Sequence, residues 1–215
     1  MNAHNKLAGM FGKAGQDKKA DKKEKVKYTW QQNVALYLHD MIFMLVIVMA
    51  VLMLFLRVIV VDGPSMENTL LNGDYMLLVG NMFYKDPSYG DIVVVSKQAY
   101  DNGKPIVKRV IATEGQTVDI DFNEGVVYVD GVALDEPYTK TLTTLREGSD
   151  FPQVVEEGNV FVMGDNRNNS KDSRSTQIGQ VDKREVLGKV IFLMYPGTGM
   201  KGDQARDFDR IGAIA

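Results

Sequence analysis

The chain has 215 residues, a formal net charge of −3 and 45% hydrophobic residues, which is enough for one membrane anchor and one domain with a core of its own. It contains no cysteine and only two histidines, His4 and His39. Disulfides, thiol catalysis and thiolate metal sites are therefore excluded. No histidine is available as a base or a metal ligand in the part of the chain that follows residue 39.

The charge is distributed unevenly along the chain. Residues 1–33 carry eight lysines and three acidic residues, a net charge of +5, so the remaining residues carry −8. The lysine-rich segment is typical of a disordered or weakly helical cytoplasmic tail. The acidic remainder argues against a nucleic-acid partner.

Residues 41–56 are sixteen consecutive apolar residues. Together with residues 57–61, in which Arg57 can snorkel, they give about 30 Å of helix, enough to span a bilayer. A cleaved signal peptide is disfavoured because the segment before the apolar run is too long and no small-x-small site follows. The upstream lysines place the N-terminus in the cytoplasm. We therefore predict a single-pass anchor over residues 34–61 and an extracytoplasmic domain over residues 62–196.

After the anchor the pattern changes to short β-rich runs broken by Gly, Asn and Asp. The predicted strands are residues 75–79, 91–96, 106–113, 117–120, 126–129, 160–163 and 186–195. Asp130 and Gly131 are typical of a two-residue hairpin turn. Residues 138–157 are polar and poor in strand formers, which predicts an excursion from the sheet, and residues 197–215 are expected to be loosely attached. The predicted fold is mainly β.

A serine follows the anchor closely. Ser65 lies four residues beyond Val61, at most about 14 Å of extended chain. Gly63 and Pro64 restrict the backbone before it, which favours a fixed turn over a flexible tether. Ser65 is therefore expected at the membrane surface, although a serine in such a place is usually part of a plain linker.

A hydrolytic serine needs a base, and without histidine the candidates are lysines and carboxylates. The period of two in a strand places Lys108 on one face with Ile106, Val110 and Ala112. Aliphatic surroundings disfavour the ammonium and lower the pKa of a lysine, which makes it a general base near neutral pH. Arg109 points to the opposite face. The alternative for Lys108 is an edge-strand lysine that opposes aggregation.

Residues 164–174 form a run of eleven residues with almost no apolar side chain. Such a segment is usually a solvated loop, and residues 168–170 also match the short glycosylation pattern. A calcium loop of the EF-hand type is rejected because no glutamate closes it. A hydrogen-bonding scaffold is the third interpretation, since Asp172 and Arg174 can pair and Ser170 can accept a hydrogen bond from a lysine amine.

Together these stretches resemble the bacterial type I signal peptidases, membrane-anchored Ser–Lys proteases, in their Gram-positive single-span form. The four motifs that carry the resemblance are residues 65–70 (SMENTL), 90–94 (GDIVV), 108–112 (KRVIA) and 164–174 (GDNRNNSKDSR). The resemblance extends from the anchor to about Pro196. It implies a β-ribbon, barrel-like catalytic domain that cleaves signal peptides after a small-x-small sequence and uses no metal or cofactor.

By this resemblance Ser65 is the nucleophile and Lys108 the general base, and Ser170 would hold the lysine amine. Gly63 and Met66 would lie with Ser65 at the oxyanion hole and the substrate groove. The residues that would brace the site are Asp165, Arg167, Asp172 and Arg174.

Several positions depart from the family pattern. Asn68 replaces the usual proline, Ala112 the usual glycine and Asn168 a frequent aspartate. Gly63 stands where some members have a serine whose hydroxyl binds the oxyanion. The oxyanion hole would then rest on the Ser65 backbone N–H and some other donor.

The sequence thus predicts an endopeptidase at the outer face of the membrane. Its partners would be secretory precursor proteins and the lipid bilayer, without nucleic acid. The rival hypothesis is a catalytically silent, membrane-anchored β domain that binds peptides or envelope partners and needs no Ser–Lys pair. The separation of Ser65 Oγ and Lys108 Nζ in the fold discriminates between the two, since 43 residues separate them in sequence.

Overall fold

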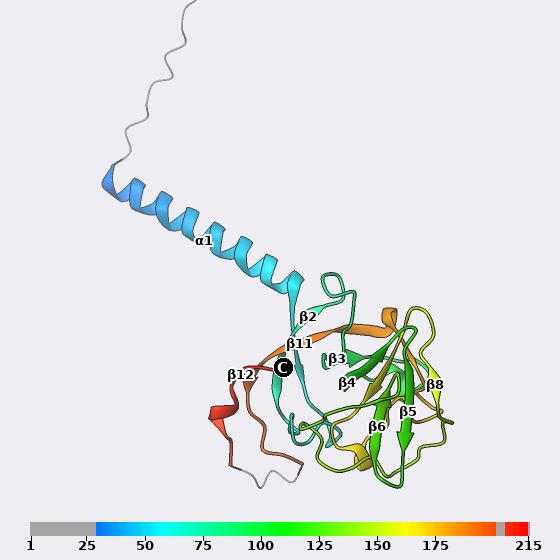
Figure 1. Ribbon diagram of the computed structural model, residues 1–215. Helices are drawn as coiled ribbons and strands as arrows, with labels where there is room; N and C mark the ends of the chain where they lie inside the picture. Colours follow the sequence, from blue (N-terminus) through cyan, green and yellow to red (C-terminus); the bar gives the residue numbers. More distant parts are fainter. Residues whose placement is uncertain (1–28, 201–204, 215) are drawn as a thin grey trace, which may run out of the picture. The chain divides into compact units, whose positions relative to one another are not determined.

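The structure is a computed structural model that describes residues 29–200 and 205–214 (Figure 1). Of the predicted cytoplasmic tail, residues 1–28 lie outside the described residues. The chain divides into two units, residues 1–46 and 47–215, and the division falls within the first helix. The larger unit contains all the described strands and the candidate site residues.

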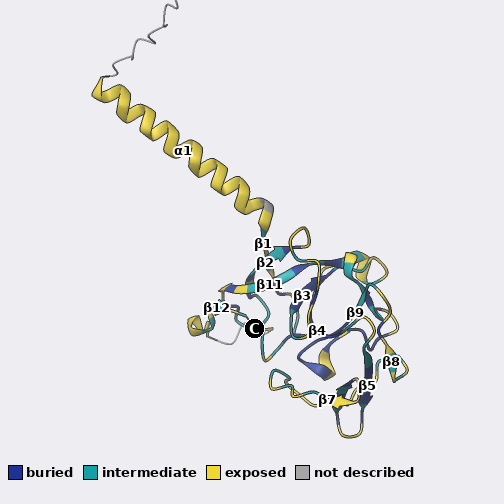
Figure 2. Ribbon diagram, turned by 45° about the horizontal axis from the view of Figure 1, so that its top comes forward, coloured by how far each residue is buried: buried dark blue, intermediate teal, exposed yellow. Residues whose placement is uncertain are grey.

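Helix α1 (Trp30–Phe55) is the long apolar element that the sequence predicts. Its residues Trp30–Met53 are sufficient in length and composition to cross a membrane. Its large apolar side chains are exposed along the helix (Figure 2). A helix that is apolar on all sides and uncovered by protein is suited to lipid.

The start of α1 lies before the predicted anchor boundary at residue 34. Thr29 and Gln32 cap this end reciprocally: the Thr29 N–H donates to Gln32 Oε1 at 2.9 Å, and the Gln32 N–H donates to Thr29 Oγ1 at 3.4 Å. These bonds satisfy two backbone N–H groups that have no acceptor within the helix at its first turn. The cap explains why the helix includes the polar residues before the apolar run.

The predicted helix through residue 61 is wrong at its C-terminal end. The helix ends at Phe55, and strand β1 (Leu56–Val60) pairs antiparallel with β2 (Tyr75–Gly80). The β-branched side chains of Val58, Ile59 and Val60 fit a strand better than a helix. Apolar length alone did not separate this strand from the helix before it.

Two antiparallel sheets build the larger unit (Figure 1). The first has the order β1-β2-β11-β3-β4-β9-β10, with β12 paired to β11, and the second has the order β7-β6-β5-β8. The other strands of the first sheet are β3 (Ile92–Val95), β4 (Ile106–Thr113), β9 (Asn159–Met163), β10 (Val181–Asp182), β11 (Val186–Tyr195) and β12 (Gly212–Ala213). Those of the second are β5 (Thr117–Asp121), β6 (Val126–Val129), β7 (Val132–Ala133) and β8 (Gln153–Val154). The short 3₁₀ turns are η1 (Asp101–Gly103), η2 (Arg167–Asn169), η3 (Lys183–Glu185) and η4 (Phe208–Arg210).

The predicted fold class, an N-terminal apolar helix followed by a mainly β domain, is confirmed. All seven predicted strands are present, and β4, β6 and β11 have the predicted bounds. Asp130 and Gly131 turn between β6 and β7 with φ of 52° and 78°, as the hairpin signal requires. Strand β8 lies inside the polar segment 138–157 and pairs with β5, so this segment returns to the second sheet.

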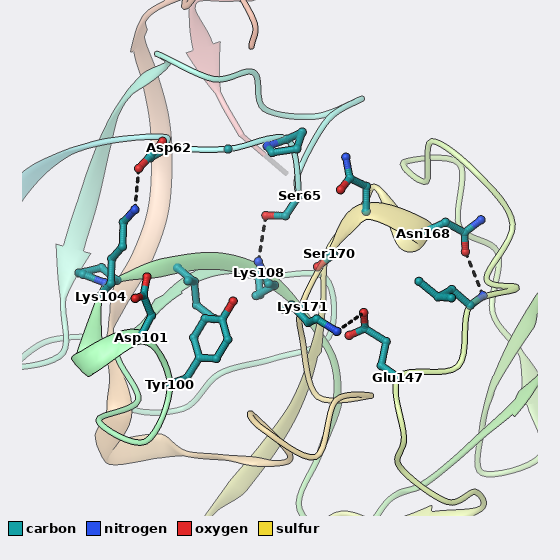
Figure 3. Close-up of a pocket in the computed structure, with 16 residues that line it drawn as sticks. Asp62, Ser65, Tyr100, Asp101, Lys104, Lys108, Glu147, Asn168, Ser170 and Lys171 are labelled. Atoms are coloured by element: carbon teal, nitrogen blue, oxygen red, sulfur yellow. Dashed lines mark hydrogen bonds and ion pairs between the residues drawn. The ribbon is translucent and has the colours of Figure 1, made fainter.

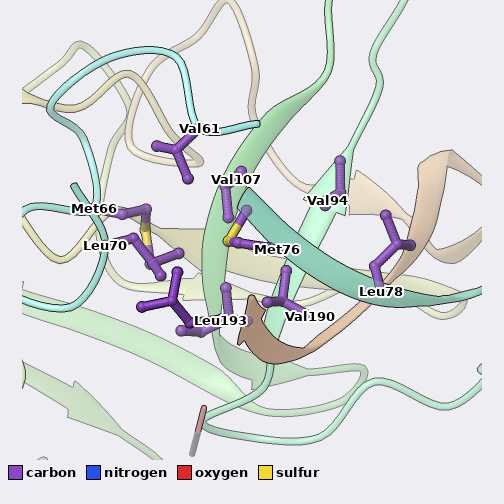
Figure 4. Packing of buried hydrophobic residues seen from close by; sticks show 10 residues of the cluster. Val61, Met66, Leu70, Met76, Leu78, Val94, Val107, Val190 and Leu193 are labelled. Carbon is purple, nitrogen blue, oxygen red and sulfur yellow. The ribbon is translucent and has the colours of Figure 1, made fainter. Parts of the chain in front are cut away.

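Three clusters of buried apolar side chains form the core. The first of them packs beneath the turn that carries Ser65 and against β2, β3, β4 and β11 (Figure 4). Its members are Val61, Met66, Leu70, Met76, Leu78, Ile92, Val94, Val107, Val190 and Leu193. Because interiors are close-packed, this cluster fixes the turn relative to β4.

The expectation of a loosely attached C-terminal segment is wrong for residues 205–214. Strand β12 pairs with β11. The Arg210 guanidinium pairs with the fully buried Asp74 at 2.7 Å and donates to Thr69 O at 3.2 Å. Arg210 and Asp74 are 136 residues apart in sequence, so composition gave no sign of this attachment.

Candidate active site

Ser65 lies in a tight turn between β1 and β2. Gly63 precedes it with φ of 111°, a conformation that favours glycine. The Leu70 N–H donates to Met66 O at 2.8 Å, and both side chains are fully buried in the first core cluster (Figure 4). The helical winding therefore turns the Met66 side chain inward, and Met66 does not line the cavity beside Ser65. The predicted place of Met66 beside the substrate groove stays a prediction.

Lys108 lies on β4 with a side chain that reaches Ser65. The residue is 2% exposed, and its Nζ donates to Ser65 Oγ at 2.9 Å and to Val107 O at 2.9 Å (Figure 3). The fold thus brings the two groups within hydrogen-bond reach, as the enzyme hypothesis requires. A silent binding domain would have no need of this contact.

The surroundings of Lys108 favour the neutral form of its amine. Burial is the largest cause, and it lowers the pKa of Lys108 from 10.5 to about 8 because the charged form loses its solvation. The Asp172 and Asp165 carboxylates oppose this shift, and the Arg174 guanidinium adds to it. The pKa lowering that was expected from the aliphatic face of β4 is therefore present.

The polar run 164–174 is a largely buried scaffold, in which only Asn168, Asn169 and Lys171 are exposed. Asp172 and Arg174 have fully buried side chains and form a two-pronged pair, with both N–O distances 2.8 Å. The Gly164 N–H donates to Asp172 Oδ2 at 3.0 Å. The Arg174 guanidinium lowers the pKa of Asp172 against the effect of burial. The pairing of these two residues is the contact that their sequence spacing predicts.

Asp165 joins the same scaffold to β4. Its carboxylate accepts hydrogen bonds from Arg109 Nε at 3.0 Å and Nη2 at 2.9 Å, and from Thr69 Oγ1 at 2.5 Å. Arg109 also stacks over the Tyr138 ring, 4.0 Å from its centroid. The sequence placed Arg109 on the face opposite to Lys108 but did not reveal these partners, which lie far away in sequence.

Arg167 is fully buried and is held by residues from another segment of the chain. Its guanidinium makes two hydrogen bonds to Glu136, at 2.8 and 2.6 Å, and one to Thr143 Oγ1 at 2.9 Å. Burial alone would lower the pKa of Arg167, but the hydrogen-bonded Glu136 carboxylate raises it above its usual value. Glu136 and Thr143 lie beside and within the polar segment 138–157, where the sequence gave no sign of a role.

Ser170 is brought to the site, but it makes no hydrogen bond to Lys108 in this structure. Its Oγ is buried and has no partner in the described part of the chain. An added Cβ at Gly164 would lie 2.2 Å from Ser170 Oγ and 2.5 Å from Ser65 O, so only glycine fits between them. The lysine-holding role of Ser170 therefore stays a prediction.

A cavity of about 420 Å³ surrounds the dyad, and Gly63 and Ser65 line it. Figure 3 shows Ser65 and Lys108 between two ion pairs, Asp62–Lys104 at 2.7 Å and Glu147–Lys171 at 3.1 Å. Among residues 29–200 and 205–214, no group of three or more His, Asp or Glu side chains is placed to hold a metal ion. The Ser65 hydroxyl and the Lys108 amine that line the cavity are suited to nucleophilic attack and proton transfer.

A serine hydroxyl bonded to a buried, partly neutral lysine amine in an open cavity defines the class of Ser–Lys hydrolases. The comparison with protein families agrees: residues 34–195 match the model of signal peptidase, peptidase S26. The chain belongs to this signal peptidase family.

Named relatives are similar over most of the chain. A probable signal peptidase I-1 from Synechocystis is 37% identical over 167 residues, 72% of this chain and 81% of the relative. Signal peptidase I S from Bacillus subtilis is 36% identical over 155 residues, 66% and 78% of the two chains. A solved structure of a signal peptidase I from Enterococcus faecalis is 30% identical, with a TM-score of 0.39, and covers 49% of this chain and 97% of that one.

Proposed function

We propose that Ser65 is the nucleophile and Lys108 the general base with which this signal peptidase cuts signal peptides from precursor proteins. The observation that carries the proposal is the 2.9 Å hydrogen bond between Lys108 Nζ and Ser65 Oγ. The lowered pKa of Lys108, about 8, supports it because a neutral amine can accept the hydroxyl proton.

The reaction proceeds in two steps. Lys108 Nζ takes the proton of Ser65 Oγ, the oxygen attacks the scissile carbonyl, and Lys108 returns the proton to the departing amine. Lys108 then deprotonates a water that attacks the acyl carbonyl, and it returns this proton to Ser65 Oγ as the ester bond breaks. The substrate lies extended in the cavity, and its small side chains before the cut fill shallow pockets, which excludes bulky residues there.

The Ser65 backbone N–H is the proposed oxyanion donor. In the described residues it donates to no protein acceptor, so it is free to bind the oxygen that becomes negative in the transition state. The Gly63 N–H is engaged, since it donates to Asn72 Oδ1 at 2.9 Å. Gly63 therefore shapes the approach to Ser65 and supplies no donor.

The four buried charged residues of the polar run serve as braces for the dyad. Asp165 ties this run to Arg109 and Thr69, and Asp172 and Arg174 hold its shape. Arg167 links it to Glu136. Ser170 would receive the lysine amine once the amine is protonated.

We propose that α1 anchors the enzyme with its N-terminus in the cytoplasm and its catalytic domain outside. The support is the apolar length of α1 and the excess of lysine before it. Anchoring holds the serine near the membrane segment of its substrates, which raises their effective concentration. Its partners are then the bilayer and secretory precursors with a small-x-small sequence before the cut, and no nucleic acid.

The test is cleavage of a secretory precursor by the full chain in detergent. The wild type is expected to cut after the small-x-small sequence, and Ser65→Ala is expected to be inactive. Ser88→Ala removes an exposed serine outside the cavity and serves as the matched control. A precursor with Phe in place of Ala before the cut is expected to resist. Cleavage by Ser65→Ala at the wild-type rate would refute the assignment of the nucleophile.

A further inference from the structure

Two buried side-chain polar atoms in the described residues have no hydrogen-bond partner, Glu147 Oε2 and Ser170 Oγ. Both residues line the cavity that contains Ser65 and Lys108 (Figure 3). An unpaired buried polar atom costs about 1–3 kcal/mol, and native folds leave few of them. Their occurrence side by side with the dyad indicates that they find partners during the reaction.

Glu147 differs from Asp62, another carboxylate of the cavity wall. Its side chain is 4% exposed, and Oε1 accepts a hydrogen bond from the half-exposed Lys171 at 3.1 Å, which leaves Oε2 unused. Asp62, at the other end of the cavity, is 71% exposed and pairs with Lys104 in solvent. Water satisfies and screens Asp62, whereas the buried Glu147 acts on the cavity in a low dielectric.

The protonated form of Lys108 lacks an acceptor. An ammonium has three N–H donors, and the structure supplies two acceptors, Val107 O and Ser65 Oγ. When the Ser65 oxygen becomes part of the acyl group, the need for another acceptor grows. Ser170 Oγ, buried and unpaired in the same cavity, can accept the remaining bond.

The charged groups that act on Lys108 are Asp172, Asp165, Arg174 and Glu147. Two of the three carboxylates already bind guanidinium groups through both oxygens: Asp172 binds Arg174, and Asp165 binds Arg109. Of these three carboxylates, only Glu147 keeps an unused oxygen.

We propose that Glu147 is a positioning residue of the dyad and acts through Ser170. When Lys108 holds the proton from Ser65, its third N–H bonds to Ser170 Oγ, and the Ser170 hydroxyl donates its own hydrogen to Glu147 Oε2, directly or through one water. The proton stays on Lys108 Nζ, and Glu147 remains a carboxylate. This inference rests on the proposed roles of Ser65 and Lys108.

Such a line of hydrogen bonds makes Lys108 a stronger base. The carboxylate stabilises the ammonium over the neutral amine, so it raises the pKa of Lys108 and opposes the effect of burial. It also fixes the direction of the lysine amine. Loss of the carboxylate then gives a weaker and less well oriented base.

The experiment measures kcat and KM against pH for the full chain in detergent, with Glu147→Gln as the isosteric neutral variant. Its acidic limb is expected to move to lower pH by about half a unit to one unit. Its plateau kcat is expected to fall about tenfold, with KM within about twofold. Asp62→Asn removes the same charge from the exposed end of the cavity and is expected to leave the acidic limb in place.

Ser170→Ala tests whether Glu147 acts on Lys108 through Ser170. In a Ser170→Ala background, Glu147→Gln is expected to have little further effect, because residues that act as a unit are not additive. A Glu147→Gln profile that superimposes on the wild type would overturn the proposal. The proposal would also be overturned if Asp62→Asn shifted the acidic limb by as much as Glu147→Gln does. The same holds if Glu147→Gln kept its full effect in the Ser170→Ala background, or if its lower kcat were explained by a lower Tm alone.

The wild type, Ser65→Ala and Lys108→Arg belong to the same series. Cleavage that no longer needs Ser65 and Lys108 would refute the proposed dyad itself. Cleavage that needs both of them but ignores Glu147 would refute only the positioning role.

Discussion

The two faces of β4 carry adjacent cationic side chains in opposite circumstances. Lys108 and Arg109 are each 2% exposed. In the described residues Lys108 Nζ donates to a hydroxyl and a carbonyl oxygen, whereas Arg109 binds both oxygens of Asp165. A buried cation without a directly bound carboxylate loses part of its charge, and one with a bidentate carboxylate keeps it. One strand thus supplies both an amine with a lowered pKa and a fixed ion pair.

Both faces hold the same turn. Lys108 contacts it at Ser65, and Arg109 and Asp165 contact it at Thr69 Oγ1, at 3.4 and 2.5 Å. The ion pair on one face therefore fixes the position at which the serine on the other face meets the amine. The residue that contacts Ser65 and the residue that supports the turn are therefore neighbours in sequence on β4.

The largest effect is expected from Lys108→Arg, which makes the two faces alike in charge. A guanidinium stays protonated at any usable pH, so it cannot take the Ser65 proton. We expect kcat/KM to fall by about 10³-fold or more, while circular dichroism and Tm show a folded protein. Lys104→Arg is the matched control at the solvent-exposed end of the cavity. Turnover of Lys108→Arg at the wild-type rate would show that Lys108 is not the base.

The next largest effect is expected when the ion pair on the Arg109 face of β4 is broken. Asp165→Asn removes the carboxylate charge that pairs with the buried Arg109 guanidinium, and removal of one partner from a buried pair costs about 3–5 kcal/mol. Denaturant unfolding of the full chain measures this loss. Breaking a solvent-exposed pair by Lys104→Met, which removes the partner of Asp62, is the control and should change stability little. Equal stabilities of the two variants would mean that Asp165 does not carry the ion pair that holds the turn.

A pH profile tests the neutral state of Lys108 directly. In the proposed mechanism activity needs the deprotonated amine, and burial lowers its pKa to about 8. We therefore expect kcat/KM to rise about tenfold per pH unit up to that value and then to level off, so that it is about 100-fold below the plateau at pH 6. A profile that is flat between pH 6 and 9 would contradict this pKa.

Local patterns predicted β4 and Lys108 because both depend on neighbours in sequence. The period of two placed Lys108 among aliphatic residues, and the spacing of Asp172 and Arg174 predicted their pair. The membrane helix was predicted in position but not at its ends, since apolar length does not distinguish a helix from the β-branched strand that follows it.

Contacts over long sequence distances could not be predicted in this way. The Arg109–Asp165 and Arg167–Glu136 pairs span 56 and 31 residues, and the topology of the sheets brings them together. The direction of the Met66 side chain is likewise set by the fold. The motif names the residue after Ser65, but the winding of the turn decides that its side chain is buried.

Asn68→Pro restores the residue that the family pattern favours and tests the turn between the two faces. Asn68 has φ of 97° and donates to Tyr138 O at 3.1 Å. Proline has φ near −65° and cannot adopt this conformation. We expect a loss of about 2–3 kcal/mol for Asn68→Pro and little change for Asn68→Gly, which tolerates positive φ. Unfolding of both variants measures this difference, and a more stable proline variant would show that the turn has another conformation.

The smallest expected effect is a gain in stability instead of a loss. Lys108→Met removes a buried amine whose folded pKa, about 8, lies below its unfolded value of 10.5. At pH 7 this lowered pKa destabilises the wild type by roughly 3 kcal/mol. The variant avoids this cost but loses the hydrogen bonds to Ser65 and Val107. We therefore expect the variant to be more stable than the wild type by about 1–2 kcal/mol. From pH 8 to 10.5 the unfolded wild type binds more protons than the folded one, so its stability rises with pH and the advantage of the variant disappears. Unfolding of both proteins at pH 7 and pH 10 measures this change, and groups common to both proteins cancel in the comparison. A variant that is less stable at pH 7, or an advantage that is equal at both values, would mean that Lys108 is held as firmly in its charged form as Arg109.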